Sequence, residues 1–378
     1  PLFSGGLVGY FVYETVHLIE PKLAAEDKKD ELGTADIELL LSEEVAVLDN
    51  LEGRLWLIVH ADPGQSDAFM QAQARLDELA PHLRSAGTAD GLRVSGDAVS
   101  EEDFSYGFNR EDFVAAVDTC KEYILAGDIF QVVLSQRMSV PYRARPLDVY
   151  RSLRALNPSP YMYFIDLGDT QIVGSSPEVL VRVQNRRVTL RPIAGTRHRG
   201  KTAAEDQALA EELLADPKEC AEHLMLIDHG RNDAGRVAST GSVEMTDQMV
   251  IERYSHVMHI FSDVQADLDR GLCAMDAIRA AFPAGTLSGA PKFRAMEIIN
   301  EFEPVKRNIY AGAVGYISWH DDTDLAIAIR TAVIHEGKLH VQAGAGIVAD
   351  SDAGKEWQET RDKGRALITA VDRASRGL

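Results

Sequence analysis

Short runs of alternating apolar and polar residues open the chain. Residues 6–16 (GLVGYFVYETV), 43–50 (EEVAVLDN) and 53–61 (GRLWLIVHA) follow this pattern, which places successive side chains on opposite faces of a strand. The last two runs are separated by the residues from Asn50 to Gly53, which predict a tight turn.

A helical spacing of apolar residues appears in residues 66–84 and again in residues 111–127 (EDFVAAVDTCKEYILAG). The run that follows, residues 129–140 (IFQVVLSQRMSV), is strand-like and rich in β-branched residues. Between the two helical segments, residues 85–103 are rich in Gly, Ser and Asp and poor in large apolar side chains. This composition indicates a linker.

The remainder of the chain alternates between long strands and helices without regular βαβ order. Hairpin turns are expected at Gly168-Asp169 and Asn185-Arg186. Helices are expected at residues 202–215, 217–229, 273–282, 291–301 and 352–373, and strands at 249–264, 311–319, 325–335 and 338–348. Long strands joined by tight turns favour antiparallel sheets with helices packed outside them, which is the α+β class.

These patterns divide the chain into three parts. We expect an N-terminal αβ part over residues 1–84, a linker-like segment over 85–103 and a catalytic core over 104–378. The chain begins PLFSGGLVGY, without Met, so the N-terminal part is expected to be truncated at its start.

The composition is that of an ordinary globular protein, with 45% hydrophobic and 26% charged residues. No apolar run approaches the length of a membrane span, so no membrane partner is expected. The net charge of −20 argues against sequence-independent binding of nucleic acid, which needs stripes of Lys and Arg. The three cysteines form no C-x-x-C pair; we expect a cytoplasmic protein in which Cys120 and Cys220 are buried.

Two pairs of glutamates share the same K-E-x-x-E spacing. Glu219 and Glu222 lie in KECAEH, and Glu356 and Glu359 lie in KEWQE. Residues three apart share a helix face, and like charges there cost roughly 0.2–0.5 kcal/mol per pair. Either each pair is part of a solvated helix face, as chance allows among 59 acidic residues, or the four carboxylates converge on a hard cation such as Mg²⁺, which prefers oxygen ligands.

Two glycine-containing motifs offer places where a backbone can approach a ligand. The segment GTLSGAPK (285–292) leads into a predicted helix that begins at Pro291. It is either an ordinary turn or an anion site of free backbone N–H groups. The segment GAGIVA (344–349) matches a dinucleotide fingerprint, but no βαβ unit surrounds it, so close backbone approach is the better interpretation.

Three polar residues stand out in otherwise apolar segments. His256 and His259 are three apart on a predicted strand, so their side chains should point to opposite faces rather than to one metal. Arg330 lies inside the apolar run LAIAIRTAVI and needs an anionic partner, from the protein or from a substrate. Lys363 follows Glu359 by four residues, which permits a simple ion pair on one helix face.

Many stretches of the chain together resemble the chorismate-utilising enzymes. The matching stretches are FQVVLSQR, NPSPYMYF, GSSPE, RPIAGTRHRG, EHLMLIDHGRND, RYSHVMH, GTLSGAPKFRAMEII, RNIYAGAVGY, IAIRTAVI, VQAGAGIVADSD and KEWQET, in family order. The resemblance is closest to the large subunits that form anthranilate. It implies a fold of two packed, mainly antiparallel β-sheets flanked by helices.

The resemblance also implies a role for each of the residues that match the family pattern. Glu222 and Glu359 would bind Mg²⁺, while Glu219 and Glu356 would support it through water. His259 would act as acid and base, and the other catalytic positions would be Thr286 and Lys363. The substrate-binding positions would be Gly195, Thr196, Tyr310, Arg330, Gly344 and Gly346.

The implied reaction adds ammonia at C2 of chorismate, expels the C4 hydroxyl and then eliminates pyruvate to leave anthranilate, a step in tryptophan biosynthesis. Ala194 stands where members of the family that form aminodeoxychorismate carry a lysine nucleophile, and alanine cannot act as one. The alternatives are a member that stops at aminodeoxyisochorismate, another chorismate-aminating enzyme, or a non-catalytic sensor on the same scaffold.

The resemblance further implies partners. No cysteine lies in a Gly-rich nucleophile turn, so ammonia would come from glutamine through a separate glutamine amidotransferase subunit. Tryptophan would be the feedback inhibitor, in a pocket that includes Pro160, Met162, Val314 and Tyr316. Two histidines depart from the family pattern: His198 stands where Pro is usual, and His229 where Leu is usual.

Overall fold

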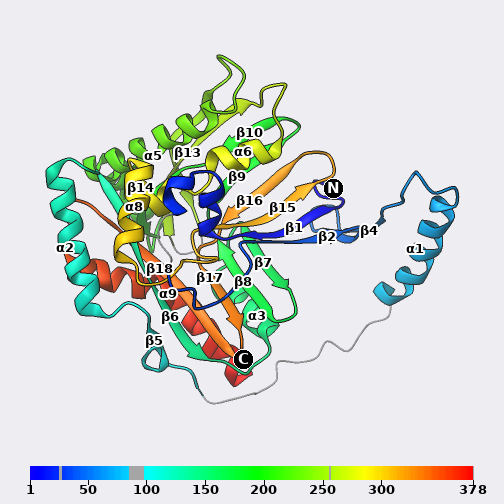
Figure 1. Ribbon diagram of the computed structural model, residues 1–378, viewed down its shortest axis with the longest axis horizontal. Coiled ribbons are helices and arrows are strands. Elements are labelled where there is room, and N and C mark those ends of the chain that lie inside the picture. The colour runs from blue at the N-terminus through cyan, green and yellow to red at the C-terminus, as the bar shows by residue number, and fades with distance from the viewer. Residues whose placement is uncertain (25–27, 85–97, 255–256, 378) are drawn as a thin grey trace.

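The computed structural model describes residues 1–24, 28–84, 98–254 and 257–377. Two antiparallel sheets pack against each other, and helices cover them (Figure 1). The predicted α+β fold is therefore confirmed. Within the described residues, no helix is long and apolar enough to cross a membrane.

The larger sheet has nine strands among the described residues. In spatial order they are β11 (Ile193–His198), β13 (Val257–Asp267), β10 (Arg187–Leu190), β9 (Val179–Gln184), β16 (Thr323–Ile327), β15 (Ala313–Ser318), β1 (Gly6–Phe11) and β2 (Ile37–Ser42), with β12 (Glu244–Arg253) paired to β13.

The smaller sheet lies against the larger one. Its order is β14 (Gly289–Ala290), β6 (Gln131–Pro141), β18 (Lys338–Ile347), β17 (Thr331–His335), β8 (Thr170–Ser176) and β7 (Tyr161–Asp166), with β5 (Ser105–Tyr106) paired to β6. Apolar side chains from both sheets join in one buried cluster that includes Tyr10, Ile172, Val314 and Val333. This shared core fixes the sheets face to face.

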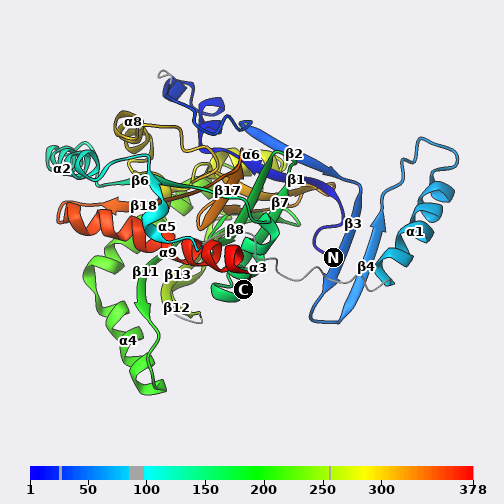
Figure 2. The same ribbon diagram turned by 90° about the horizontal axis from the view of Figure 1, so that it is seen from below.

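Helices flank both sheets, and the first helix of the chain lies away from the core (Figure 2). They are α1 (Ala68–Arg84), α2 (Arg110–Ala126), α3 (Pro146–Leu156), α4 (Ala203–Ala215), α5 (Pro217–Gly235), α6 (Ala274–Ala281), α7 (Gly285–Ser288), α8 (Lys292–Phe302) and α9 (Ala353–Arg376), with short 3₁₀ turns at Tyr13–Leu18, Pro21–Ala24 and Glu101–Asp103. Helices α3 and α9 contact the smaller sheet, and α5 and α6 contact the larger one.

Local sequence explains where these helices begin and end. The side chain of Asn109 accepts a hydrogen bond from the backbone N–H of Asp112 and caps the start of α2, and Gly127 ends that helix at φ 84°. Asp216 caps α5 in the same way, and Asp352 caps α9. Helices α5 and α9 therefore begin just before their glutamate pairs.

The predicted N-terminal part is divided in space. Strand β1 pairs with β15 and β2 pairs with β1, so these two strands extend the larger sheet of the core. The hairpin of β3 (Glu44–Asp49) and β4 (Arg54–Val59) lies with α1 away from the core (Figure 2). Most of the predicted linker, residues 85–97, falls outside the described part of the chain, and the division at residue 84 stays a prediction.

Three predictions of local structure were wrong. The strand expected at 249–264 is the antiparallel pair β12 and β13. The strand expected at 325–335 is two strands, β16 in the larger sheet and β17 in the smaller one. Helix α8 begins at Lys292, with Pro291 as its N-cap residue. The predicted hairpin turns between β7 and β8 and between β9 and β10 are confirmed.

The cysteines follow the prediction in part. Cys120 is fully buried, as expected, whereas Cys220 is only half-buried and Cys273 is exposed. Cys220 lies in the first turns of α5, where the helix leaves part of its surface open to solvent.

Candidate active site

The two glutamate pairs lie in the first turns of α5 and α9. The starts of these helices are linked by Lys218, whose Nζ is 3.2 Å from the carboxylate of Asp350. The same lysine interacts electrostatically with Glu222 and Glu356. The structure therefore brings both predicted pairs to one region, as a shared site requires.

Two of the four carboxylates in this region, those of Glu222 and Glu356, are partly removed from water. Burial raises the pKa of Glu222, and the nearby Glu219 raises it further. The Nε2 of Gln131 donates to Glu222 at 3.3 Å. Burial likewise raises the pKa of Glu356, and Glu359 adds to that effect. Like charges that are partly removed from water favour a cation as ligand.

The other two glutamates of the pairs each form an ion pair with a cationic side chain. Glu219 is paired with Arg197 at 3.1 Å, and Glu359 is paired with Lys363 at 2.6 Å. Within the described residues, no three His, Cys, Asp or Glu side chains lie close enough to surround a metal ion. The donor set fits Mg²⁺ in its chemistry, since that ion takes one or two carboxylates and keeps several waters.

His259 on β13 presents a neutral imidazole. Its Nδ1 lies 2.8 Å from the carbonyl oxygen of Gly195, which can only accept, so Nδ1 donates. The Oγ1 of Thr196 is 3.1 Å from the same nitrogen. Burial lowers the pKa of His259, and Arg330 lowers it further. The Nε2 of the ring is therefore the basic atom. His256 lies outside the described residues, so its predicted orientation stays a prediction.

A bulge in β11 positions the residues around His259. The register of β11 against β13 shifts between Ala194 and Arg197. At this shift Gly195 adopts φ 66°, and a Cβ there would lie 3.1 Å from the Oε2 of Glu219. Glycine lets the backbone bend so that its carbonyl meets the imidazole.

Arg330 lies where the chain crosses from β16 to β17. It adopts φ 51°, which is unusual for a residue with a side chain. Burial lowers the pKa of its guanidinium, and Tyr310, Glu359 and Glu178 partly offset this effect. Among the described residues, no Asp or Glu side chain forms an ion pair with Arg330, so an anionic ligand would satisfy this cation.

Glycines of strand β18 allow polar side chains to lie close to its backbone in the region of Arg330. The Nζ of Lys363 donates to the carbonyl of Gly344 at 3.0 Å. A Cβ at Gly344 would lie 2.8 Å from the hydroxyl of Tyr310, and one at Gly346 would lie 2.6 Å from the Nε2 of Gln131. Both predicted glycines are therefore required by the packing of polar side chains around them.

The sequence prediction missed Glu178. This residue follows β8 and is only 9% exposed. Burial raises its pKa to about 7, although Thr286, Lys363 and Arg330 act in the opposite direction. The hydroxyl of Thr286 on α7 donates to it at 2.9 Å. The signals of Glu178 in the sequence were the stretch GSSPE, which matches the family and ends at this glutamate, and the apolar run VLV that follows it.

The residues of the predicted inhibitor pocket come from strands of both sheets. Pro160 precedes β7, which contains Met162, while Val314 and Tyr316 lie on β15. The hydroxyl of Tyr161 donates to Asp324 at 2.8 Å, and Asp324 pairs with Tyr316 across the strands. Whether tryptophan binds there stays a prediction.

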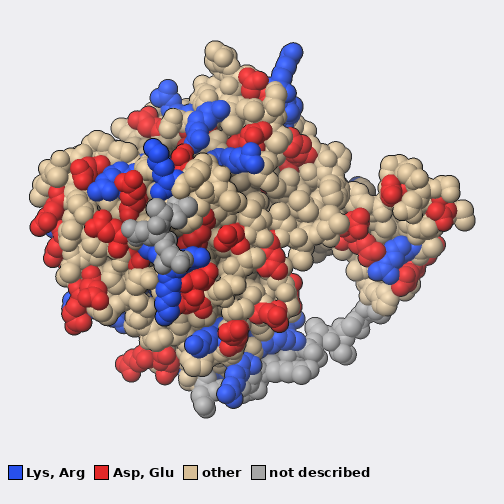
Figure 3. All heavy atoms as spheres, viewed as in Figure 1, with Lys and Arg blue, Asp and Glu red and all other residues tan. Residues whose placement is uncertain are grey.

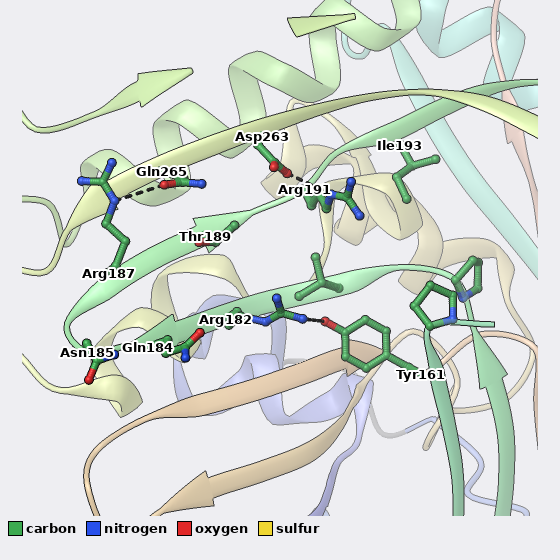
Figure 4. A pocket seen from close by; sticks show the side chains of 13 residues that line it. Tyr161, Arg182, Gln184, Asn185, Arg187, Thr189, Arg191, Ile193, Asp263 and Gln265 are labelled. Atoms are coloured by element: carbon green, nitrogen blue, oxygen red, sulfur yellow. Dashed lines mark hydrogen bonds and ion pairs between the residues drawn. The ribbon is translucent and has the colours of Figure 1, made fainter. Parts of the chain in front are cut away.

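A cavity bordered by Pro160 lies over the larger sheet (Figure 4). It has a volume of about 590 Å³, and polar and apolar side chains both form its walls. Arg182 is paired there with Asp324, and Arg191 with Asp263. His259, Arg330 and Lys363 do not line this groove. Acidic and basic side chains are also interspersed over the face seen in Figure 3, so local cations rather than the net charge must attract an anion.

Comparison with known proteins places the chain in a family. A model of the family described as chorismate binding enzyme matches residues 2–369. The chain is 59% identical over 372 residues to anthranilate synthase component 1 of Pseudomonas putida, covering 98% of this chain and 76% of that protein. The chain is 57% identical over 379 residues to the protein of the same name from Pseudomonas aeruginosa, and the match covers 100% of this chain and 77% of that protein.

A solved structure agrees with these relatives. The crystal structure of anthranilate synthase component I from Streptococcus pneumoniae TIGR4 superposes with a TM-score of 0.89 at 42% identity. The match covers 97% of this chain and 81% of that one. The family model, the relatives and the solved structure agree, and this chain therefore belongs to the chorismate binding enzyme family.

Proposed function

We propose that this chain is the large subunit of an anthranilate synthase, which converts chorismate and ammonia to anthranilate, pyruvate and water. The relatives that cover nearly the whole chain carry that name. The structural observation that carries the proposal is the buried guanidinium of Arg330 beside Glu178, a carboxyl whose pKa lies near 7. Together they suit a carboxylate substrate that must lose a hydroxyl group.

Arg330 and Tyr310 would hold the enolpyruvyl carboxylate of chorismate. The guanidinium presents donors in a planar fork that matches a carboxylate. Tyr310 is buried, and burial raises the pKa of its phenol, so it stays a neutral donor. Thr196 and the backbone near Gly346 would complete the pocket around the ring.

Glu178 would be the acid of the first half-reaction. Ammonia forms a bond to C2 while the bond from C4 to its hydroxyl breaks, and the leaving oxygen takes a proton from Glu178 to become water. The added nitrogen then gives up one proton to water. A carboxyl with a pKa of about 7 is well suited to donate near neutral pH.

His259 would serve the second half-reaction. Removal of the proton on C2 forms the aromatic ring as the bond from C3 to the enolpyruvyl oxygen breaks, and the enolpyruvate takes a proton at its methylene carbon to become pyruvate. The neutral imidazole offers its Nε2 for proton transfer, because its Nδ1 is held by Gly195. Thr196 contacts the same ring and would help to orient it.

Mg²⁺ is the cofactor that the glutamates would hold. Glu222 and Glu359 would be direct ligands, and Glu219 and Glu356 would support the ion through water. When bound, the ion would neutralise the ring carboxylate of chorismate and orient it. Lys363, which is paired with Glu359, would adjust the charge of this half of the site.

A glutamine amidotransferase subunit would be the partner that supplies ammonia, and tryptophan would inhibit. The name component 1 of the relatives implies a second component. Ala194 is buried in β11, opposite Ile260, and has no group that could attack C2. Direct attack by ammonia is therefore the course that this site permits.

The test is a mixture of the purified chain with chorismate, Mg²⁺ and an ammonium salt at mildly alkaline pH. Anthranilate fluorescence and pyruvate are measured with and without a chelator. Equimolar products that disappear with the chelator support the proposal. A non-aromatic amine would instead identify an enzyme that stops at aminodeoxyisochorismate, and untouched chorismate would contradict both assignments.

A further inference from the structure

A second, smaller pocket touches the candidate active site. Its volume is about 40 Å³. Glu178 and Thr286, which are bonded to each other, line one part of it, and His229 and Asp233 of α5 line another. The pocket therefore connects the proposed catalytic acid to a helix that also carries the glutamates Glu219 and Glu222.

His229 lines this pocket and has an unsatisfied ring nitrogen. Its Nδ1 is buried and has no hydrogen-bond partner among the described residues. The start of α7 approaches closely, because a Cβ at Gly285 would lie 2.4 Å from that nitrogen. Buried polar atoms in folded proteins are nearly always paired with protein or with ordered water, so Nδ1 calls for a water molecule.

The pocket has the size and the lining that water needs. A volume of about 40 Å³ accommodates roughly two or three water molecules, each of which needs about 10–15 Å³ of such space and two to four polar partners. The carboxyl of Glu178, the hydroxyl of Thr286, the carboxylate of Asp233 and the imidazole of His229 provide these partners.

The charges around the pocket keep His229 neutral. Burial lowers the pKa of its imidazole, Lys292 lowers it further, and the exposed Asp228 acts in the opposite direction. The Nζ of Lys292 is itself 3.2 Å from the carboxylate of Asp233 and donates to the carbonyl of Ala281. A neutral imidazole can accept a proton at one nitrogen and release one from the other.

The pocket also has a way to solvent. It shares Val179 and Arg191 with the cavity of about 590 Å³ over the larger sheet. Water in the pocket can therefore exchange protons with bulk water without crossing the side of the site that holds the substrate.

We propose that water held by His229, Asp233 and Thr286 forms a proton relay to Glu178, an inference that rests on the proposed function. Each turnover removes one proton from Glu178 when the C4 hydroxyl leaves as water. A pocket water then gives one proton to the Glu178 carboxylate and takes one from the next water or from His229. Bulk water restores that proton, so His229 is neutral before and after the cycle.

The first test compares His229→Leu with His229→Asn in the ammonia-dependent reaction. Leucine is the residue that the family resemblance gives at this position, so the fold should tolerate it, and asparagine keeps a polar atom near the position of Nδ1. His229→Leu is expected to lower kcat about tenfold, less than the 10²–10⁴ typical of losing the acid itself, with an unchanged KM for chorismate. It should also increase the solvent deuterium isotope effect on kcat.

Two controls sharpen this comparison. His229→Asn is expected to retain most of the parental kcat, because water can still be held in the pocket. His198→Leu, the same change at an exposed histidine of β11, is expected to leave kcat and the isotope effect unchanged. A parental kcat and isotope effect in His229→Leu would overturn the relay, as would equal losses in the leucine and asparagine variants.

A crystal structure of the same chain provides a test that is independent of activity. Ordered water within hydrogen-bond distance of His229 Nδ1 and of Glu178 or Thr286 is expected, and a dry pocket would overturn the relay even in an active enzyme. If the unmodified protein forms no anthranilate, the proposed function is overturned. The relay then has no reaction to serve, whether or not water occupies the pocket.

Discussion

Replacing Glu178 with glutamine should stabilise the folded protein at alkaline pH while it removes activity. Glu178 is buried, and burial raises its pKa to about 7 from the ordinary 4.5. At about 1.4 kcal/mol per pKa unit, the difference of about 2.5 units means that the charged form costs the folded state about 3 kcal/mol. Glutamine has nearly the same shape and carries no charge, so it avoids this cost.

The sign of the effect follows from proton binding. Below pH 4.5 the carboxyl is protonated in both the folded and the unfolded chain, so no cost arises. Between about pH 4.5 and 7 the unfolded chain loses this proton while the folded chain keeps it. The folded state then binds more protons than the unfolded state, so the free energy of unfolding falls as the pH rises. The full cost is present above pH 7.

Urea unfolding at pH 4.5 and at pH 8.5 measures this cost for the parent and for Glu178→Gln. The variant's advantage in the free energy of unfolding should be about 3 kcal/mol larger at pH 8.5, and its turnover should fall by roughly 10²–10⁴. Glu102→Gln, at an exposed glutamate, controls for the loss of one negative charge from a chain with a net charge of −20. An advantage that is the same at both pH values, or parental turnover, would refute the reasoning.

Three further predictions concern the metal, the substrate and the course of the reaction. Glu222→Gln should raise the Mg²⁺ concentration needed for half-maximal turnover at least about tenfold, and an unchanged Mg²⁺ titration would remove this residue from the metal site. Arg330→Gln should leave or improve the stability of the free protein, since it removes a desolvated cation, but should abolish the rise in Tm that chorismate causes; a retained rise would place the substrate elsewhere. Ala194→Lys should suppress formation of anthranilate in the ammonia assay, and normal amination would show that residue 194 does not face C2.

Features that depend on neighbouring residues could be predicted from the sequence. The turn between β7 and β8 contains Gly168, which adopts φ 85°, and the helix α2 ends at a glycine in the same left-handed region. Such residues mark a chain reversal or a helix end wherever they occur. The periodicity of apolar residues between these points then identified the elements themselves.

Features that depend on which sheet a strand joins could not be predicted in this way. The run LAIAIRTAVI is apolar on both sides of Arg330 and Thr331 because β16 and β17 are both buried, each in its own sheet. Periodicity reports burial and does not report the change of sheet. The only mark of the crossing is Arg330 at φ 51°, and an arginine gives no local signal for that conformation.

The candidate site shows the same division. The glutamates of α5 and α9 were visible as a repeated spacing within two helices. Glu178 was not, because its raised pKa arises from burial among β8, α7 and the Arg330 crossing, which are distant in the sequence. The sequence of one segment cannot show that three distant segments together exclude water from a carboxyl group.

The free protein therefore keeps a carboxyl acid and a guanidinium cation that are both desolvated and are not paired with each other. Arg330 interacts electrostatically with Glu178, yet no ion pair within the described part of the chain joins the two side chains. A direct pair would ionise Glu178 and lower its pKa, which would remove it as an acid. Thr286 donates to the carboxyl instead, and the guanidinium is left for a substrate carboxylate. Because Glu178 and Arg330 are not paired, the free chain is less stable than it would be with an ion pair between them. The substrate carboxylate removes this cost when it binds Arg330, and Glu178 protonates that same substrate.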